Sequence, residues 1–204
     1  MALIKLYDGT TNQNNGIILK RALAELARFQ RVHITPTPGL IDISGYNLVQ
    51  RLAAESTHQG RRQVHVGELL NKFKSIPAVV NEPERQNIIL LEQDLYSDGL
   101  NWCFGGYQQH AGVDFVTVST ARIQDDIHLF HILAHELGHM YGATYQGRSN
   151  TEQNLGSHCT NDLCVMQQQL TVADSVRYAH RRMNSNAPTY CRQCGDNLKT
   201  SLHY

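Results

Sequence analysis

The segment 125–142, DDIHLFHILAHELGHMYG, constrains the fold of this chain more than any other stretch. Apolar residues recur in it at three- and four-residue intervals, which is the period of a helix with one buried face. These residues are Ile127, Phe130, Leu133, Ala134, Leu137 and Met140. Asp125 and Asp126 suit the N-terminal end of a helix, and Gly142 suits the left-handed turn that ends one. The sequence therefore predicts a single helix here.

This helix contains HELGH, an instance of the pattern HExxH. His135 and His139 lie about one turn apart, so both side chains leave the same face and can hold one zinc ion. Glu136 lies about 100° around the helix from His135, within reach of a water on that metal. The pattern is typical of the active-site helix of zinc metalloproteases. Taken alone it is also compatible with two solvated histidines, because short motifs occur by chance.

The composition narrows the class of protein. A length of 204 residues suits one domain, and the 18 basic residues equal the 18 acidic ones. This balance argues against nucleic acid or an anionic membrane as the main partner. No stretch reaches the roughly 20 apolar residues that span a membrane, and the N-terminal segment lacks the pattern of a signal peptide. We therefore expect a cytoplasmic protein, in which paired cysteines favour metal over disulfides.

The remaining pattern alternates between helices and strands. Amphipathic or apolar periodicity predicts helices over 17–30, 45–55, 66–73 and 171–183. Strands are predicted over 3–7, 32–35, 87–91, 100–104 and 113–120, with a turn or bulge at Gly105–Gly106 and a polar loop over 143–157. This order indicates an α/β (α+β) fold, in which helices pack against a mixed sheet.

Further motifs follow the predicted metal helix. His158-Cys159 is followed after four residues by Cys164-Val165-Met166, and the tail carries Cys191-Arg-Gln-Cys194. With HELGHMYG, this series resembles the pattern of the archaemetzincin family, HExxHxxGxxHC, then C-x-M, then a distant CxxC. EQDLYSDGLNWCFGG and VDFVTVSTARI also resemble the strand segments that precede the family's active-site helix. The resemblance covers 87–194, whereas 1–86 carries no motif that matches.

The resemblance implies a single catalytic domain over 1–204, with 1–86 as its N-terminal part and 87–194 as its core. The expected fold is a metzincin-like mixed twisted sheet with backing and active-site helices. A small C-terminal part would carry a site of four cysteines.

The chain departs from the family pattern at the third histidine. The family has two residues between its glycine and that histidine, whereas fifteen residues separate Gly142 from His158 here. In strict register, the ligand position falls on Tyr145, which is the alternate third ligand. We assign the ligand to His158 because the cysteines and the methionine that follow it stay in step with the family. The thirteen extra residues must then fold outwards and return the chain to the metal.

Two zinc ions per chain are implied. His135, His139 and His158 would bind the catalytic zinc, which leaves a fourth position open for water, and Glu136 would act as general base and then as general acid. Met166 resembles the Met-turn residue, a hydrophobic floor beneath the zinc and not a ligand. The structural zinc would be bound by Cys159, Cys164, Cys191 and Cys194, with two disulfides as the alternative.

The resulting expectation is a zinc-dependent metallopeptidase that hydrolyses peptide bonds in a peptide or protein substrate. The alternative is a catalytically inactive metzincin-fold module for binding or regulation, stabilised by structural zinc. Glu136 favours the peptidase, because an inactive scaffold has no chemical need for this carboxylate. A purely structural zinc ribbon would leave HELGH unexplained. We expect a packing or supporting role for His131 and a buried apolar environment for Cys103.

Overall fold

The computed structural model describes residues 3–12, 14–30, 45–80, 85–110 and 112–200. The chain divides into two compact units. Unit 1 comprises Met1–Ile17 and Thr35–Arg122, and unit 2 comprises Ile18–Ile34 and Ile123–Tyr204. The strand predicted over 32–35 lies outside the described residues, and the single catalytic domain over 1–204 stays a prediction.

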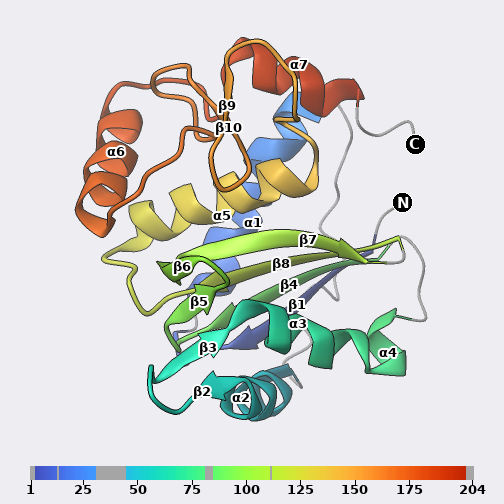
Figure 1. Cartoon of the computed structure of the whole chain (residues 1–204). Coiled ribbons are helices and arrows are strands. Elements are labelled where there is room, and N and C mark those ends of the chain that lie inside the picture. Colours follow the sequence, from blue (N-terminus) through green and yellow to red (C-terminus); the bar gives the residue numbers. More distant parts are fainter. Residues whose placement is uncertain (1–2, 13, 31–44, 81–84, 111, 201–204) are drawn as a thin grey trace. The chain divides into compact units, whose positions relative to one another are not determined.

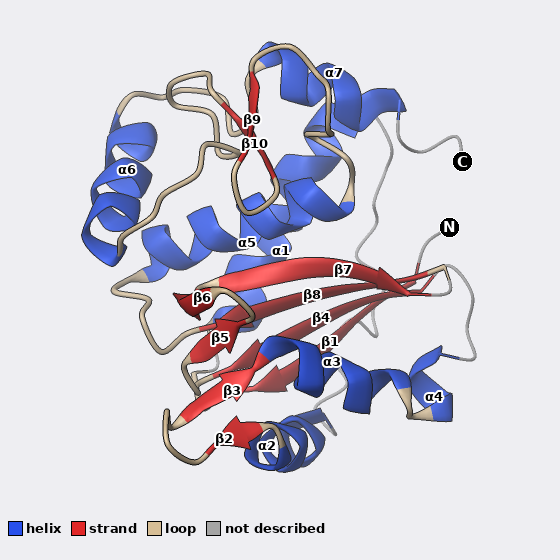
Figure 2. Cartoon of the chain, in the orientation of Figure 1, coloured by secondary structure: helices blue, strands red, loops and turns tan. Residues whose placement is uncertain are grey.

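Unit 1 holds most of the strands (Figures 1 and 2). Its strands are β1 (Leu3–Gly9), β2 (Thr57–His58), β3 (Gln63–His65), β4 (Arg85–Leu91), β5 (Leu95–Ser97), β6 (Leu100–Cys103), β7 (Gly105–His110) and β8 (Val113–Ser119). Its helices are α2 (Gly45–Glu55), α3 (Val66–Lys74) and the short α4 (Pro77–Val80). One sheet has the strand order β1-β4-β8-β7, and the other has the order β2-β3-β5-β6. The predicted mixed α/β architecture is confirmed.

The larger sheet is parallel except for its edge strand β7. Leu6 pairs with Ile88, which pairs with Val116, so apolar residues line up across three parallel strands. The apolar run of β4 is fully buried from Ile88 to Leu91, as expected for a central strand covered on both faces. On one face α2 and α3 complete a core in which the rings of Tyr7 and Phe73 meet edge to face at 5.3 Å. Burial of this continuous apolar run explains why β4 lies in the interior of the sheet and not at its edge.

The turn or bulge predicted at Gly105–Gly106 is wrong, because both residues belong to β7 and pair with β8. A Cβ atom at Gly105 would lie 2.3 Å from the carbonyl oxygen of Thr117. Glycine is therefore needed for the close approach of two strands, which is a second common reason for glycine in a sheet.

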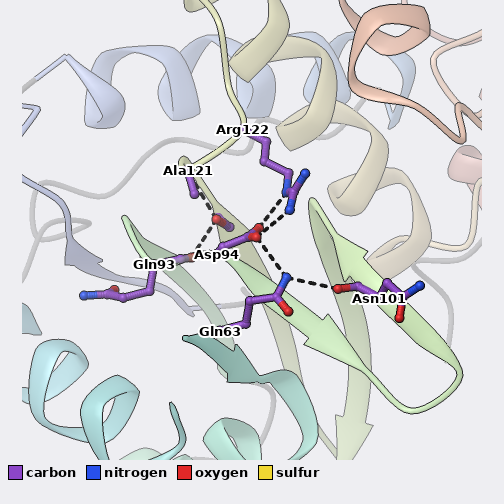
Figure 3. A network of polar contacts seen from close by, with 7 residues as sticks. Gln63, Gln93, Asp94, Asn101, Ala121 and Arg122 are labelled. Carbon is purple, nitrogen blue, oxygen red and sulfur yellow. Dashed lines mark hydrogen bonds and ion pairs between the residues drawn. The ribbon is translucent and has the colours of Figure 1, made fainter. Parts of the chain in front are cut away.

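A polar network ties the end of β8 to the second sheet (Figure 3). The carboxylate of Asp94 accepts hydrogen bonds from Arg122 Nε and Nη2 at 2.7 and 2.6 Å, and from Gln63 Nε2 at 2.9 Å. Burial opposes ionisation of Asp94, but these donors outweigh it and lower its pKa. The guanidinium of Arg122 also lies 4.8 Å from the ring centroid of Trp102. The network fixes the last residues of unit 1.

Unit 2 is mainly helical (Figure 2). It contains α1 (Asn15–Gln30, from Ile18 onwards), α5 (Asp126–Met140), β9 (Thr151–Gln153), β10 (Ser157–Cys159), α6 (Val172–Asn184) and α7 (Arg192–Thr200). The guanidinium of Arg21 on α1 lies 4.9 Å from the ring centroid of Phe130 on α5. The segment 143–157, predicted as a loop, instead contains β9 and the start of β10, which pair as an antiparallel hairpin. Among the described helices of the whole chain, none is both long and apolar enough to cross a membrane.

The Asp94 network gives a test of unit 1. Asp94→Asn removes the charge that Arg122 contacts, so we expect the free energy of unfolding to fall by about 1–2 kcal/mol at pH 7. Because the carboxylate stabilises the fold only while ionised, the difference should shrink as the pH falls below about 4. Urea unfolding measures it. The control is Asp98→Asn, because the Asp98 side chain is fully exposed and its contact with His65 Nε2 at 3.2 Å is open to solvent. An equal loss in both variants would contradict the prediction.

Candidate metal centres

Helix α5 carries the HELGH pattern and begins and ends close to the predicted residues. The side chain of Asp125 caps it by accepting a hydrogen bond from His128 N at 2.8 Å. Tyr141 ends the helix, and Gly142 follows with φ +70°, which is the left-handed conformation expected of it. Glycine adopts this conformation without strain. The sequence signals for both ends of the helix are therefore confirmed.

The structure brings the three predicted histidines together. One ring nitrogen of each of His135, His139 and His158 lies within 4.8 Å of the others. The Nε2 atoms of His135 and His139 are 3.1 Å apart, and the ring of His158 stacks on that of His135 at 5.2 Å between centroids. Zinc–nitrogen bonds of 2.0–2.1 Å in tetrahedral geometry place ligand nitrogens about 3.3 Å apart. The spacing of the first two nitrogens is close to this requirement.

The protonation states also suit a metal. The Nδ1 atom of His135 lies 2.8 Å from the carbonyl oxygen of Val165, so Nδ1 carries the proton and Nε2 presents its lone pair. Burial lowers the pKa of His135 to about 4 and that of His139 well below its usual value. Among the described residues, the buried Nδ1 atom of His158 has no hydrogen-bond partner. A neutral imidazole keeps one nitrogen lone pair and is the form that binds zinc.

The inserted segment 143–157 leads into the β9–β10 hairpin (Figure 1). His158 lies on the second strand of this hairpin, β10. His158 pairs with Glu152, and the hairpin turns at Leu155 and Gly156, both with positive φ. Tyr145, the alternate ligand, has a side chain that is 55% exposed. The convergence of the three histidines supports the choice of His158, whose role as a ligand stays a prediction.

Glu136 lies next to His135 on α5 and is only 8% exposed. Burial raises its pKa to about 8. No charged neighbour among the described residues offsets this shift. A buried carboxyl without a cationic partner costs stability, so packing alone does not explain its place. Its position fits a group that exchanges a proton in the site.

Met166 packs beneath the HELGH helix at Gly138. A Cβ atom at Gly138 would lie 2.2 Å from Met166 Sδ and 2.9 Å from a ring carbon of Tyr190. Met166 and Tyr190 are fully buried, and Tyr190 Oη donates a hydrogen bond to Ala134 O at 2.7 Å. The glycine of HELGH therefore makes room for the predicted methionine floor. No motif in the sequence pointed to Tyr190.

The four predicted cysteines also converge, with all Sγ atoms within 4.8 Å of one another. Cys159 and Cys191 are separated by 3.8 Å between sulfurs, and Cys164 and Cys194 by 3.6 Å. A tetrahedral zinc with bonds of 2.3 Å places its sulfurs about 3.8 Å apart, whereas a disulfide requires about 2.0 Å. The cysteines are free thiols here. This geometry fits a metal and not the disulfide alternative.

The two centres share three segments of chain. His158 precedes Cys159, Val165 and Met166 follow Cys164, and Tyr190 precedes Cys191. Main-chain hydrogen bonds join them, from Cys159 N to Met166 O at 2.8 Å and from Val165 N to Thr189 O at 2.9 Å. A change in the cysteine site should therefore move groups that contact the histidine site. The role of the Val165 carbonyl had no signal in the sequence, because a backbone atom carries none.

Of two further residues, His131 lies as expected and Cys103 does not. His131 is buried and packs edge to face on Tyr178 at 5.6 Å between ring centroids. Cys103 is half-buried rather than fully buried, at the end of β6 in unit 1.

No family model matches the chain. It is 32% identical over 119 residues to the archaemetzincin of Methanopyrus kandleri, a match that covers 55% of this chain and 55% of that protein. The chain thus spans about half the length of this relative. It is 27% identical over 132 residues to the archaemetzincin of Pyrobaculum aerophilum, covering 63% of this chain and 70% of that one.

Solved structures match over nearly the whole chain. The archaemetzincin of M. kandleri gives a TM-score of 0.64 at 19% identity, covering 100% of this chain and 96% of that one. The archaemetzincin of Archaeoglobus fulgidus in complex with malonate gives a TM-score of 0.59 at 18% identity, and the match covers 95% of this chain and 98% of that one. A zinc-dependent peptidase from Methanocorpusculum labreanum gives a TM-score of 0.60 at 18% identity, and the match covers 96% of this chain and 99% of that one.

The class that the fold and the two residue clusters define is an archaemetzincin-like mixed α/β protein with a histidine cluster and a cysteine cluster that could each hold a metal. The sequence matches indicate common descent, so the chain is a homologue of the archaemetzincins.

The contact at Gly138 gives a test of this arrangement. Gly138→Ala should lower the free energy of unfolding by about 1–3 kcal/mol, because the new methyl group overlaps Met166 in a packed interior. Gly106→Ala is the control, since a Cβ atom there meets nothing within 4 Å. Urea unfolding compares both with wild type. A Gly138→Ala protein as stable as the control would contradict the packing described.

Proposed function

We propose that this chain is a zinc-dependent peptidase that hydrolyses peptide bonds. The observation that carries the proposal is the convergence of three neutral imidazoles next to the buried carboxyl of Glu136. The names of the homologues support it, since one related structure is described as a zinc-dependent peptidase. The substrate is then a peptide or a protein.

His135, His139 and His158 would hold the catalytic zinc, and Tyr145 remains the alternate third ligand. Three protein ligands leave one position open. When bound, the ion supplies Lewis acidity, which lowers the pKa of a coordinated water to about 7 and polarises the scissile carbonyl. The residues fit this ion because they offer neutral nitrogens, one of them fixed by Val165 O.

Glu136 performs the proton transfers. Its carboxylate takes the proton of the attacking water and then gives it to the leaving amine, first as general base and then as general acid. Burial favours its protonated form, and a divalent cation nearby favours the carboxylate, so both forms are accessible near neutral pH. No covalent bond to the enzyme forms in this reaction.

The four cysteines would hold the second, structural zinc, which gives two zinc ions per chain. That site would fix the chain segments that carry His158, Met166 and Tyr190. It is closed, because four protein ligands complete a tetrahedral coordination.

Glu136→Gln is the decisive variant. We expect kcat on a peptide library to fall by about 10²–10⁴-fold, because the general base is lost, while both zinc ions stay bound. Asp126→Asn changes an exposed acid on the same helix and should cleave like wild type. Mass spectrometry of the cleavage products and elemental analysis of zinc are run on the same samples. Metal-loaded wild type without cleavage would instead favour the catalytically inactive binding or regulatory module.

Cys194→Ser tests the second metal. We expect the zinc content to fall from two ions to one or fewer, with lower thermal stability and weaker peptidase activity, because the shared segments lose their anchor. Cys103→Ser, outside both clusters, should keep both zinc ions. Unchanged zinc content in Cys194→Ser would rule out the four-thiolate site.

A further inference from the structure

Arg148 is a buried arginine in the inserted segment 143–157, only 7% exposed. Its Nη1 atom donates a hydrogen bond to Ala143 O at 2.7 Å. Nη1 and Nη2 both contact Cys194 Sγ, at 3.4 and 3.3 Å. Within the described part of the chain it makes no ion pair with a carboxylate. Among the described residues, the cysteine cluster is therefore the only group beside this guanidinium that can supply negative charge.

Charge balance explains this contact. An arginine is always charged, and burying it without an opposite charge is costly. Four thiolates on one divalent zinc carry a net charge of about −2, which is also costly to bury. The forked guanidinium of Arg148 meets Cys194 with two nitrogens, so each group compensates the other. Neutral thiols or a disulfide would leave Arg148 uncompensated.

The same side chain fastens the inserted segment. Ala143 O accepts hydrogen bonds from Arg148 Nη1 and from Asn197 Nδ2 on α7, at 2.7 and 3.0 Å. Further along, Thr160 N donates to Asn150 O at 3.0 Å. Arg148 thus joins the start of the insertion to the cysteine cluster, and the insertion ends at the hairpin that carries His158.

We propose that Arg148 is a positioning residue that links the two metal centres, balancing the charge of the thiolates through Cys194 and holding the inserted segment so that His158 reaches the other two histidines. The inference rests on the proposed function, because it assumes metal at both centres. On this proposal, the inserted segment does more than separate Gly142 from His158, because its Arg148 side chain contacts the cysteine cluster.

Cobalt binding tests the proposal without any measurement of activity. The zinc-free protein (residues 1–204) is titrated with Co²⁺, whose thiolate-to-metal charge-transfer band reports the cysteine site. The histidine site gives no such band, so its affinity is measured from the Co²⁺ bound at equilibrium dialysis in excess of the thiolate-bound ion. In Arg148→Gln we expect affinity at the cysteine site to fall about 10–100-fold, as for other residues that contact metal ligands. Affinity at the histidine site should fall as well. The charge-transfer band should move to longer wavelength, because a thiolate without a cationic donor gives up charge more readily.

Two further variants control the experiment. Arg192→Gln removes an arginine next to Cys191 whose side chain is 98% exposed, so both affinities and the band should match wild type. Arg148→Lys keeps the charge but not the fork, and should lie between wild type and Arg148→Gln; it also serves if Arg148→Gln does not fold. Circular dichroism checks the fold of each variant.

The outcomes separate this inference from the proposed function. Wild-type affinities and an unshifted band in Arg148→Gln and Arg148→Lys would overturn the role of Arg148, whether or not the wild type cleaves peptides. The predicted losses in a protein that cleaves nothing would support Arg148 and count against the peptidase. If the wild-type protein shows no charge-transfer band, its cysteines do not bind the metal, and the proposed role of Arg148 is wrong.

Discussion

The gathering of three imidazoles and four thiols in a protected interior is the constraint on which unit 2 depends. Two Nε2 atoms lie 3.1 Å apart in the histidine site, and sulfurs lie 3.6–3.8 Å apart in the cysteine site. Lone pairs held this closely repel each other unless a proton or a metal cation lies between them, so each cluster is built in a way that could hold a metal. The α5 helix, the hairpin and the loop before α7 each bring donors to this interior, and their arrangement follows from that requirement.

Much of the fold was predictable where burial leaves a clear pattern. The caps of α5, the apolar run of β4 and helices α2, α3 and α6 follow from periodicity and from helix-end signals. Strand β7, GGYQQH, and the hairpin strands TEQ and SHC were missed. They are short and lack an alternating apolar pattern, so pairing with a neighbouring strand is what defines them. Such pairing depends on residues distant in sequence, which local patterns do not reveal.

The candidate site, like the fold, was predictable only in part. Ligand types and their spacing pointed to three histidines, four cysteines, Glu136 and Met166, and the structure gathers the seven potential ligands into two clusters. Three contributions left no trace in the sequence: the carbonyl of Val165, the phenol of Tyr190 and the guanidinium of Arg148. The first is a backbone atom, and the other two residues are of types that occur anywhere in a chain. Their roles come from position alone.

The β9–β10 hairpin has a consequence for how such proteins are recognised. A metal site constrains where the third donor lies, and the number of residues used to reach that point is free if the extra chain pairs with itself. A spacing of two residues and one of fifteen can thus end at the same place in space. A search that demands fixed spacing within HExxHxxGxxH would pass over this chain. The residues that follow the histidine are a more reliable criterion, because the cysteine cluster fixes the spacing between them.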